Sequence, residues 1–219
     1  MKKVIAIDGP AGAGKSTLAK RAAEKLGYVY IDTGAMYRSV AWKVLQEYRD
    51  SKFTDADIAA IADNLTVTLS YENGSQRIAV DGTDVSEVIR TPEVTAIVSQ
   101  VAAISSVRRK MVVLQQKMAS NGGVIMDGRD IASKVLPNAD VKIFLTASIE
   151  ERANRRYKEM KEKGFEVDLA KLRDEIAARD KADSEREESP LVRVPEAILL
   201  DTTNMNLDEA EAAIIRLAE

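Results

Sequence analysis

Short apolar runs alternate along this chain with longer stretches of helical periodicity. Residues 4–7 are all apolar and stop at Asp8-Gly9-Pro10, which predicts a short buried strand. From residue 16 to residue 26 apolar side chains recur at every fourth position, which is typical of an amphipathic helix. Gly27 follows, where a helix stop is expected.

Four further apolar runs predict strands of the same kind. Residues 28–31 follow the first helix and complete a strand–helix–strand unit, whose crossover we expect to be right-handed. The later runs lie at residues 124–126, 141–145 and 197–200, and each is followed by polar residues and a helical pattern. Five such strands predict an α/β fold, a five-stranded parallel sheet flanked by helices.

Residues 65–90 interrupt this rhythm. Residues 65–71 alternate between apolar and polar, residues 72–75 have the composition of a turn, and residues 77–80 form a second short run. This pattern predicts a β-hairpin, an antiparallel β insertion with flanking helices in a separate lobe. Residues 148–188 are heavily charged and follow a helical pattern, which predicts a mobile helical lid.

Composition excludes several kinds of chemistry. The 219 residues include no cysteine and no histidine, so disulfides, cysteine–zinc sites and histidine bases are ruled out. A formal net charge of −3 makes nucleic acid a poor partner. No apolar run reaches the length of about 18–20 residues that a membrane span needs. We therefore expect a cytoplasmic protein that works with Lys, Arg, Asp and hydroxyl groups.

A phosphate-binding motif lies between the first strand and the first helix. Residues 9–16 fit G-x-x-x-x-G-K-[ST] at every fixed position. Glycines let backbone N–H groups surround phosphate oxygens, and the helix N-terminus adds partial positive charge. Lys15 would reach the β- and γ-phosphates of ATP, and Ser16 would place a hydroxyl on Mg²⁺. The alternative is an ordinary glycine-rich turn. The expected ATP-binding residues are Gly9, Pro10, Ala11, Gly12, Ala13, Gly14, Lys15, Ser16 and Thr17.

Two other strand ends carry polar groups. The carboxyl ends of parallel strands meet at one edge of a sheet, where ligands bind. Thr33 and Arg38 follow the second strand and suit a second phosphate, although a capped helix with a surface arginine is the alternative. Asp127, Arg129 and Asp130 follow the strand at residues 124–126. Asp127 is suited to organising Mg²⁺ and its waters, although an acid at a strand end is often only a cap.

Together these segments resemble bacterial cytidylate kinases. The resemblance rests on residues 9–17, Asp-Thr-Gly-Ala-Met-Tyr-Arg at 32–38, Ser-Gln-Val-Ala-Ala at 99–103, Asp-Gly-Arg-Asp at 127–130 and Ala-Arg-Asp at 178–180. It spans nearly the whole chain. Adenylate kinases would carry D-G-[FY]-P-R in place of residues 127–130. One departure is visible, because the family usually continues D-G-R-D-I with Gly-Thr, whereas Ala132-Ser133-Lys134 follow here.

The resemblance implies specific roles for residues of this chain. It implies cytosine contacts from Ser99, Arg108 and Asp130, and monophosphate contacts from Thr33, Arg38 and Arg129. Acceptors on Ser99 and Asp130 suit the cytosine amino group, and Arg108 suits its ring acceptors. Uracil inverts two of these groups, so mismatched buried polar atoms would disfavour it. Further implied contacts to sugar, phosphate and base come from Arg179, Asp183 and Arg186.

Two arginine clusters have support from spacing alone. Arg179, Asp183 and Arg186 stand at i, i+4 and i+7, which would put them on one helical face. The alternative is a solvated face with an Arg179–Asp183 ion pair. The helix expected from residue 149 carries Arg152, Arg155 and Arg156, whose cations suit a transferring phosphoryl group. Neighbouring acids could neutralise them instead, namely Glu150, Glu151 and Glu159.

Together with the motifs, the resemblance implies a nucleoside-monophosphate kinase that acts on CMP or dCMP, with ATP as phosphoryl donor and Mg²⁺ as cofactor. Catalytic residues would be Lys15, Arg129, Arg152, Arg155 and Arg156, and Ser16 and Asp127 would hold the metal. Expected parts are a core (1–34, 100–147, 189–219), a monophosphate-binding lobe (35–99) and a lid (148–188), in a monomer. The alternatives are another small-molecule kinase and a nucleotide-switched binding protein.

Overall fold

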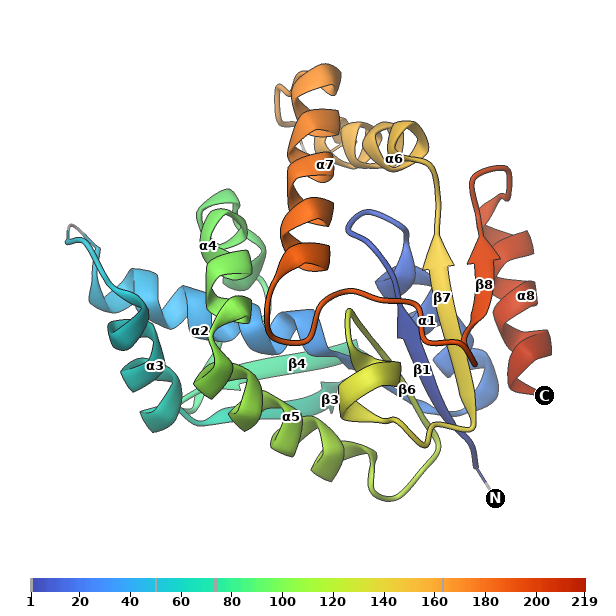
Figure 1. Cartoon of the computed structure of the whole chain (residues 1–219), viewed down its shortest axis with the longest axis horizontal. Helices are drawn as coiled ribbons and strands as arrows, with labels where there is room; N and C mark the ends of the chain where they lie inside the picture. The colour runs from blue at the N-terminus through green and yellow to red at the C-terminus, as the bar shows by residue number, and fades with distance from the viewer. Residues whose placement is uncertain (1, 50, 73–74, 163) are drawn as a thin grey trace. The chain divides into compact units, whose positions relative to one another are not determined.

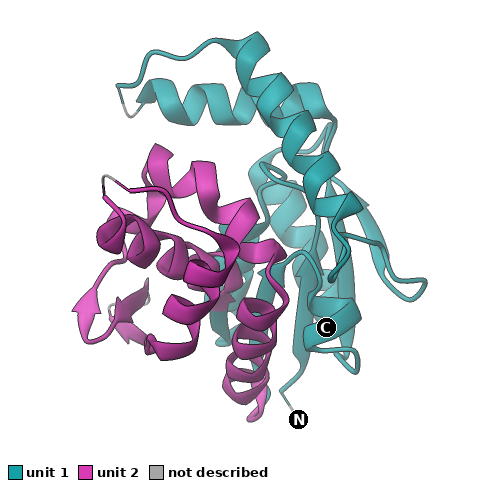
Figure 2. Ribbon diagram, turned by 60° about the vertical axis from the view of Figure 1, so that its left-hand side comes forward, with its two compact units in different colours: residues 1–30, 122–219 teal, residues 31–121 magenta. Residues whose placement is uncertain are grey.

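The computed structural model describes residues 2–49, 51–72, 75–162 and 164–219. The chain forms two compact units, residues 1–30 with 122–219 (unit 1) and residues 31–121 (unit 2), which Figure 2 colours separately. Each unit has a hydrophobic core of its own. None of the helices in the described ranges is both long and apolar enough to cross a membrane.

A five-stranded sheet, in the order β2-β6-β1-β7-β8, organises unit 1 (Figure 1). Its strands are β1 (Val4–Asp8), β2 (Val29–Asp32), β6 (Val124–Gly128), β7 (Val141–Thr146) and β8 (Ile198–Asp201). The last two residues of β2 already belong to unit 2. β1 pairs in parallel with β6 and β7, and β7 pairs in parallel with β8. The predicted parallel α/β sheet is confirmed, with every strand within two residues of its expected bounds.

Helices α1 (Lys15–Leu26) and α8 (Leu207–Ala218) pack on this sheet. Alternate residues of β1 and β7 point to one face, where they join apolar residues of both helices in a buried core. Burying each large aliphatic side chain contributes roughly 1.5–3 kcal/mol. Gly27 ends α1 with φ 64°, as the sequence predicted. The core includes Ile5, Ile7, Leu18, Ala22, Ile143, Leu145 and Ile214.

The connection after β6 differs from the expected helix. It contains only a five-residue π-helix, η2 (Ile131–Val135), before the chain enters β7. Pro137 limits the length of η2, because the residue that precedes a proline rarely adopts a helical backbone conformation. The expectation of a helical pattern after this strand was therefore wrong beyond a single short turn.

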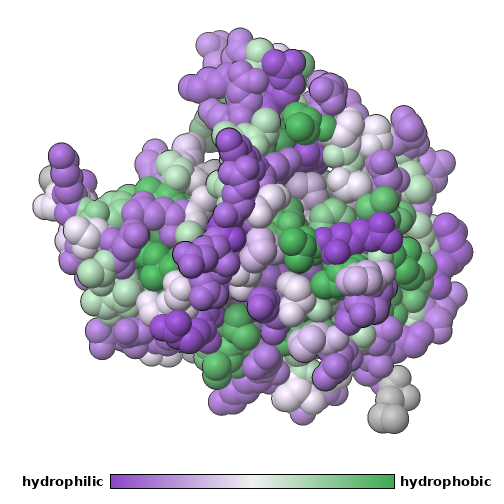
Figure 3. Space-filling view, in the orientation of Figure 1, coloured by the Kyte–Doolittle hydropathy of each residue, from purple (hydrophilic) through white to green (hydrophobic). Residues whose placement is uncertain are grey.

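Residues 148–188 are mostly helical, as predicted. They form α6 (Ile149–Glu162) and α7 (Leu169–Glu185), which pack against each other. Only three α7 side chains are buried, and the surface that these helices form at the top of Figure 3 is mainly hydrophilic. Their role as a lid stays a prediction.

Unit 2 combines helices with a small antiparallel sheet. The predicted hairpin is confirmed as β3 (Val67–Glu72) and β4 (Ser75–Val80), in the register Val67 opposite Val80. Its expected turn at Asn73-Gly74 lies outside the described residues. A third strand, β5 (Thr83–Asp84), and a 3₁₀ turn, η1 (Val88–Arg90), were not predicted, because two or three residues show no periodicity.

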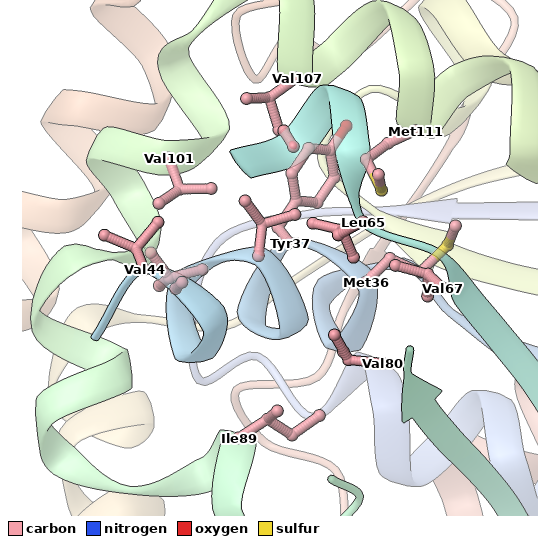
Figure 4. Packing of buried hydrophobic residues seen from close by; sticks show 14 of the residues in the cluster. Met36, Tyr37, Val44, Leu65, Val67, Val80, Ile89, Val101, Val107 and Met111 are labelled. Atoms are coloured by element: carbon pink, nitrogen blue, oxygen red, sulfur yellow. The ribbon is translucent and has the colours of Figure 1, made fainter. Parts of the chain in front are cut away.

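Four helices complete unit 2 and share its core with the sheet. They are α2 (Thr33–Glu47), α3 (Asp55–Asn64), α4 (Pro92–Ala103) and α5 (Ser105–Ala119). Figure 4 shows Met36 of α2, Val80 of β4 and Met111 of α5 in this core. Asp32 caps α2 by accepting a hydrogen bond from the Ala35 N–H. The sequence Thr54-x-x-Asp57 forms a capping box that starts α3.

Candidate active site

The phosphate-binding loop joins β1 to α1 in unit 1. Gly9 has φ 151°, and a Cβ at this position would lie 1.9 Å from the carbonyl oxygen of Leu145. Only glycine allows this approach of two backbone segments. Gly14 precedes α1 with φ 88°, in the left-handed region that glycine tolerates. Lys15 and Ser16 are the first two helical residues, so the helix N-terminus faces the loop interior.

Lys15 is buried inside this loop, and its Nζ donates a hydrogen bond to the Pro10 carbonyl oxygen at 2.7 Å. Burial lowers the pKa of the Lys15 ammonium well below its ordinary value, and the charge of Arg129 acts in the same direction. The carboxylates of Asp127 and Asp8 oppose this shift. A phosphate bound here would favour the charged amine, because an opposite charge at short range stabilises the ionised form.

Asp127 lies at the end of β6, beside β1, and accepts two hydrogen bonds. Ser16 Oγ donates to Asp127 Oδ2 at 2.9 Å, and the Tyr30 hydroxyl donates to Asp127 Oδ1 at 2.8 Å. The structure thus brings the two expected metal-binding residues together. A hydroxyl and a carboxylate are oxygen ligands of the kind that Mg²⁺ prefers. Mg²⁺ usually binds one or two carboxylates together with substrate phosphates and waters, so this donor set fits it.

A second carboxylate, Asp8, lies at the end of β1 and is 2% exposed. Its Oδ1 accepts from the Ile131 N–H and its Oδ2 from the Ala132 N–H, both at 2.8 Å. Burial raises the pKa of Asp8 to about 6, although these two hydrogen bonds lower it. Asp8 thereby ties the strand that leads into the phosphate-binding loop to the turn that follows Asp130.

Asp130 is also buried and directly precedes η2. Its side chain makes no capping hydrogen bond to the η2 backbone. Asp8 accepts from the N–H groups of Ile131 and Ala132 at the start of η2. Neighbouring Arg129 donates from Nε to Asp183 Oδ2 at 2.8 Å. Arg129 is therefore hydrogen-bonded to Asp183 of α7, whereas Asp130 makes no capping bond to η2.

Asp183 lies near several cations in unit 1. Burial would raise its pKa, but the charge and hydrogen bond of Arg129, with Arg179 and Arg186, hold the pKa below its ordinary value. Arg186 is the C-cap residue of α7, which ends at Glu185, and its backbone is extended. The chain turns back here, and the Leu191 N–H bonds the Asp183 carbonyl oxygen. Arg186 Nη1 still lies 3.9 Å from Asp183 Oδ1.

The arginines of α6 have three different environments. Arg152 is 4% exposed, pairs with Asp180 of α7 at 2.6 Å, and donates to the carbonyl oxygen of Ala11 in the phosphate-binding loop. Arg155 pairs with Glu151 and donates to the carbonyl oxygens of Ala13 and Thr202. Arg156 pairs only locally, with Glu159. Acids neutralise all three, so the alternative of a structural role is also consistent with their contacts.

The remaining candidates lie in unit 2. Thr33 is buried at the start of α2, and Arg38 on the same helix donates to the Thr95 hydroxyl at 2.8 Å. Ser99 lies half-buried on α4. Arg108 of α5 is buried, donates to the Ala102 carbonyl oxygen, and stacks over the Tyr37 ring with 5.2 Å between its Cζ and the ring centroid. In this unit the candidates therefore lie on helices, and only Thr33 directly follows a strand.

Sequence reasoning missed three polar groups that contact the candidate residues, namely Asp8, Tyr30 and Asp180. Asp8 was visible only as the acid that interrupts the first apolar run. Tyr30 lay within the second predicted strand and Asp180 within the Ala-Arg-Asp segment. The sequence suggested a role for neither. Each acts through a contact at least 28 residues away in the sequence, so local spacing carried no signal.

The loop, its buried lysine and the paired Ser16 and Asp127 together define a phosphate-binding-loop protein with an α/β sheet. A solved structure of an uncharacterized protein from Eubacterium ventriosum has a similar fold, with a TM-score of 0.54 and 16% identity over 98% of this chain and 97% of that one.

Closer relatives identify the family. The family model for cytidylate kinase matches residues 5–219. A curated cytidylate kinase from Lysinibacillus sphaericus is 52% identical over 98% of this chain and 96% of its own length. One from Caldicellulosiruptor saccharolyticus is 50% identical over 99% and 96%. The chain belongs to the cytidylate kinase family, and is thus a nucleoside-monophosphate kinase.

Proposed function

We propose that this chain transfers the γ-phosphoryl group of ATP to CMP or dCMP, giving ADP and the corresponding diphosphate. The observation that carries the proposal is the 2.9 Å hydrogen bond between Ser16 and Asp127 beside buried Lys15 in the phosphate-binding loop. The acceptor phosphate oxygen is already anionic, so in-line attack needs no strong general base. A chain without histidine can therefore catalyse it by positioning and charge neutralisation.

On the ATP side, residues 9–17 hold the triphosphate. Backbone N–H groups of the loop surround the β- and γ-phosphates, and Lys15 offsets the negative charge that they carry. Ser16 and Asp127 hold Mg²⁺, which when bound neutralises phosphate charge. Tyr30 fixes one oxygen of Asp127 and leaves the other toward Ser16. Arg152, Arg155 and Arg156 contribute further positive charge near the transferring group.

On the acceptor side, arginines hold the monophosphate and polar groups select the base. Arg129, supported by its hydrogen bond to Asp183, binds phosphate with Arg38 and Thr33. Asp130 accepts from the cytosine amino group, together with Ser99, while Arg108 donates to the ring acceptors. The buried position of Asp130 directly after Arg129 supports this role. Arg179, Asp183 and Arg186 complete the binding residues.

The proposal also assigns parts to the chain. Residues 1–34, 100–147 and 189–219 form the catalytic core, residues 35–99 bind the monophosphate, and residues 148–188 close as a lid that excludes water. Hydrogen exchange in residues 148–188 should slow when an ATP analogue and CMP are both bound. Equal exchange in the free and doubly bound enzyme would contradict lid closure. The protein should act as a cytoplasmic monomer. A molecular mass of two chains, measured by light scattering, would contradict a monomer.

An acceptor panel and one substitution test the assignment. ADP release should depend on CMP or dCMP more strongly than on UMP, AMP or GMP. A different preferred acceptor would indicate another small-molecule kinase, and ATP binding without acceptor-dependent release would indicate a nucleotide switch. Asp130→Asn should narrow the preference for CMP over UMP by roughly 1–3 kcal/mol, the scale of one mispaired buried polar contact. An unchanged ratio in folded enzyme would remove Asp130 from base selection.

A further inference from the structure

We propose that Arg152 and Arg155 are positioning residues for the phosphate-binding loop, which hold two of its peptide groups in the orientation that binds phosphate. Each of these arginines of α6 fixes one carbonyl group of the loop and thereby directs the N–H of the next residue, Gly12 or Gly14. The inference rests on the proposed function, in which residues 9–17 hold ATP. It adds how the two arginines act, namely through the loop backbone and before any nucleotide binds.

The loop does not fix these two peptide groups by itself. Gly12 and Gly14 have φ 73° and 88°, and each follows an alanine. Glycine adopts positive and negative φ about equally well, so local sterics leave the peptide before it two possible orientations. The loop peptides are planar and trans, so turning one exchanges the sides to which its C=O and N–H groups point. A contact from outside the loop can therefore select one orientation.

The two arginines provide such contacts. Arg152 Nη1 donates to the Ala11 carbonyl oxygen at 2.9 Å, and Arg155 Nη1 donates to the Ala13 carbonyl oxygen at 3.3 Å. α6 also packs closely on the loop, since a Cβ on Gly12 would lie 3.4 Å from Arg152 Cβ. Each bonded carbonyl group shares a peptide with the N–H of the glycine that follows. With the carbonyl group held toward α6, that N–H points to the opposite side.

Both guanidinium groups are anchored at the carboxyl end of the sheet. Arg152 Nε donates at 2.9 Å to the carbonyl oxygen of Ala147, which directly follows β7. Arg155 Nη2 donates at 2.7 Å to the carbonyl oxygen of Thr202, which directly follows β8 and is 1% exposed. The Thr202 N–H in turn donates to the Thr146 carbonyl oxygen of β7 at 2.8 Å. The arginines thus connect the loop to the sheet at fixed points, which a role of their charge alone would not require.

The same contacts strengthen the two glycine N–H groups as donors. A cation at the carbonyl end of a peptide polarises it, and successive hydrogen bonds reinforce one another where water is excluded. Arg152 is 4% exposed, so solvent screens its charge only weakly. The positive charge of the arginines therefore reaches a bound phosphate through the loop peptides. This effect acts on every phosphate that the loop binds, not on the transferred group alone.

NMR of the nucleotide-free enzyme tests the inference without any reaction. Arg152→Lys keeps the positive charge but loses the planar fork that contacts two carbonyl oxygens and Asp180 at once. We expect this variant to shift or broaden the Gly12 amide signal more than the Gly14 signal, and Arg155→Lys to do the reverse. Because no phosphate is present, a direct contact between arginine and nucleotide predicts no change at either glycine.

Arg156→Lys is the matched control on the same helix, because Arg156 pairs with Glu159 of α6. It should leave both glycine signals unchanged. An unchanged glycine signal in either folded test variant, or equal changes at both glycines, would overturn the proposal. If Arg152→Lys does not fold, Arg155→Lys decides by itself, since the Arg155 side chain is 30% exposed and its substitution costs less stability.

ADP binding separates positioning from a role limited to the transferred group. ADP lacks the γ-phosphate but still occupies the loop, so Arg152→Lys should weaken its binding at least about fivefold, the scale of one hydrogen bond with a charged donor. Isothermal titration measures this with no acceptor present. Unchanged ADP affinity with a lower kcat would contradict the proposal and leave the proposed phosphoryl transfer intact. Weaker ADP binding in an enzyme that prefers another acceptor would support the positioning role and contradict the assignment to CMP.

Discussion

The two units of this chain differ in the charge that they bury. Among the described residues, unit 1 buries seven charged side chains, namely Asp8, Lys15, Asp127, Asp130, Arg152, Asp183 and Glu211. Unit 2 buries two, Asp32 and Arg108, and its other buried polar groups are neutral, mainly hydroxyls. A buried charge costs stability unless partners offset it, so a concentration of such groups marks where the fold is adapted to chemistry.

The difference teaches how the two units serve one reaction. Unit 1 buries charged side chains at or just after the ends of β1 and β6, namely Asp8, Asp127 and Asp130, and others on its helices. Unit 2 is an apolar scaffold whose helices present a few polar side chains, among them Arg38 and Arg108. Substitutions of charged residues in unit 1 should therefore change turnover, and substitutions in the core of unit 2 should change stability.

The largest effect is expected for Lys15→Ala. If Lys15 stabilises charge that builds during transfer, as proposed, kcat should fall at least about a hundredfold, the loss typical of one electrostatic group in an active site. Circular dichroism should show an intact fold. Steady-state ADP release measures the rate, and near-normal turnover in the folded variant would remove Lys15 from the mechanism.

In unit 2, Met111→Ala should lower the free energy of unfolding by about 2–4 kcal/mol, because Met111 is fully buried and its truncation leaves a cavity. Affinity for an ATP analogue should not change. Urea unfolding followed through Trp42, the only tryptophan, reports on this unit because Trp42 packs against its core. Val113→Ala on the same helix is the control, since Val113 is 64% exposed. A large loss of ATP affinity in Met111→Ala would break the contrast.

Substitutions of two arginines of α6 should affect the free energy of unfolding and kcat of unit 1 differently. Arg152→Ala leaves Asp180 without its partner and removes a donor to the phosphate-binding loop, so the free energy of unfolding should fall by about 2–3 kcal/mol, together with kcat. Arg156→Ala breaks only a half-exposed pair with Glu159, worth at most about 0.5 kcal/mol. Its effect should appear in kcat alone. Equal stability losses in the two variants would show that burial does not distinguish them.

The smallest effect concerns pH. The pKa of Asp8 is raised to about 6, and the protonated acid can accept only one of its two backbone N–H groups. Asp130 and Lys15 are the charged groups that face Asp8.

The raised pKa of Asp8 also determines how the free energy of unfolding should depend on pH. Because the pKa of Asp8 is higher in the folded protein than its ordinary value of 3.8, folding favours proton binding between these values. The contribution of Asp8 to stability is fully present below pH 3.8 and is lost as pH rises through about 6. Chemical unfolding at pH 5 and pH 7 should therefore show a smaller pH dependence for Asp8→Asn than for the parent, and an identical dependence would contradict the shift.

Much of unit 1 was predictable because its signals are local. The apolar runs gave all five strands, and the loop motif gave the positions of Lys15 and Ser16. The contacts of Asp8 and Tyr30 were not predictable, because each depends on a partner brought close only by sheet pairing. The roles of the site residues stay predictions.

Elements without a period of their own were missed in both units. β5 has two residues and belongs to its sheet only through pairing with β4. The end of α7 at Glu185 was also not predicted, because the bond there from the Leu191 N–H to the Asp183 carbonyl oxygen leaves no trace in helical periodicity.

The order in which unit 1 is connected has a consequence for synthesis. β1 pairs with β6 in the register Val4 opposite Val124, so its hydrogen-bonding partner is made 120 residues later. At roughly 5–20 residues per second on the ribosome, this apolar strand waits about 6–24 s for its partner. All residues of the core of unit 2 are made within that interval. The inserted unit can thus fold first, while the strand that leads into the phosphate-binding loop is the segment of the nascent chain that most needs protection from aggregation.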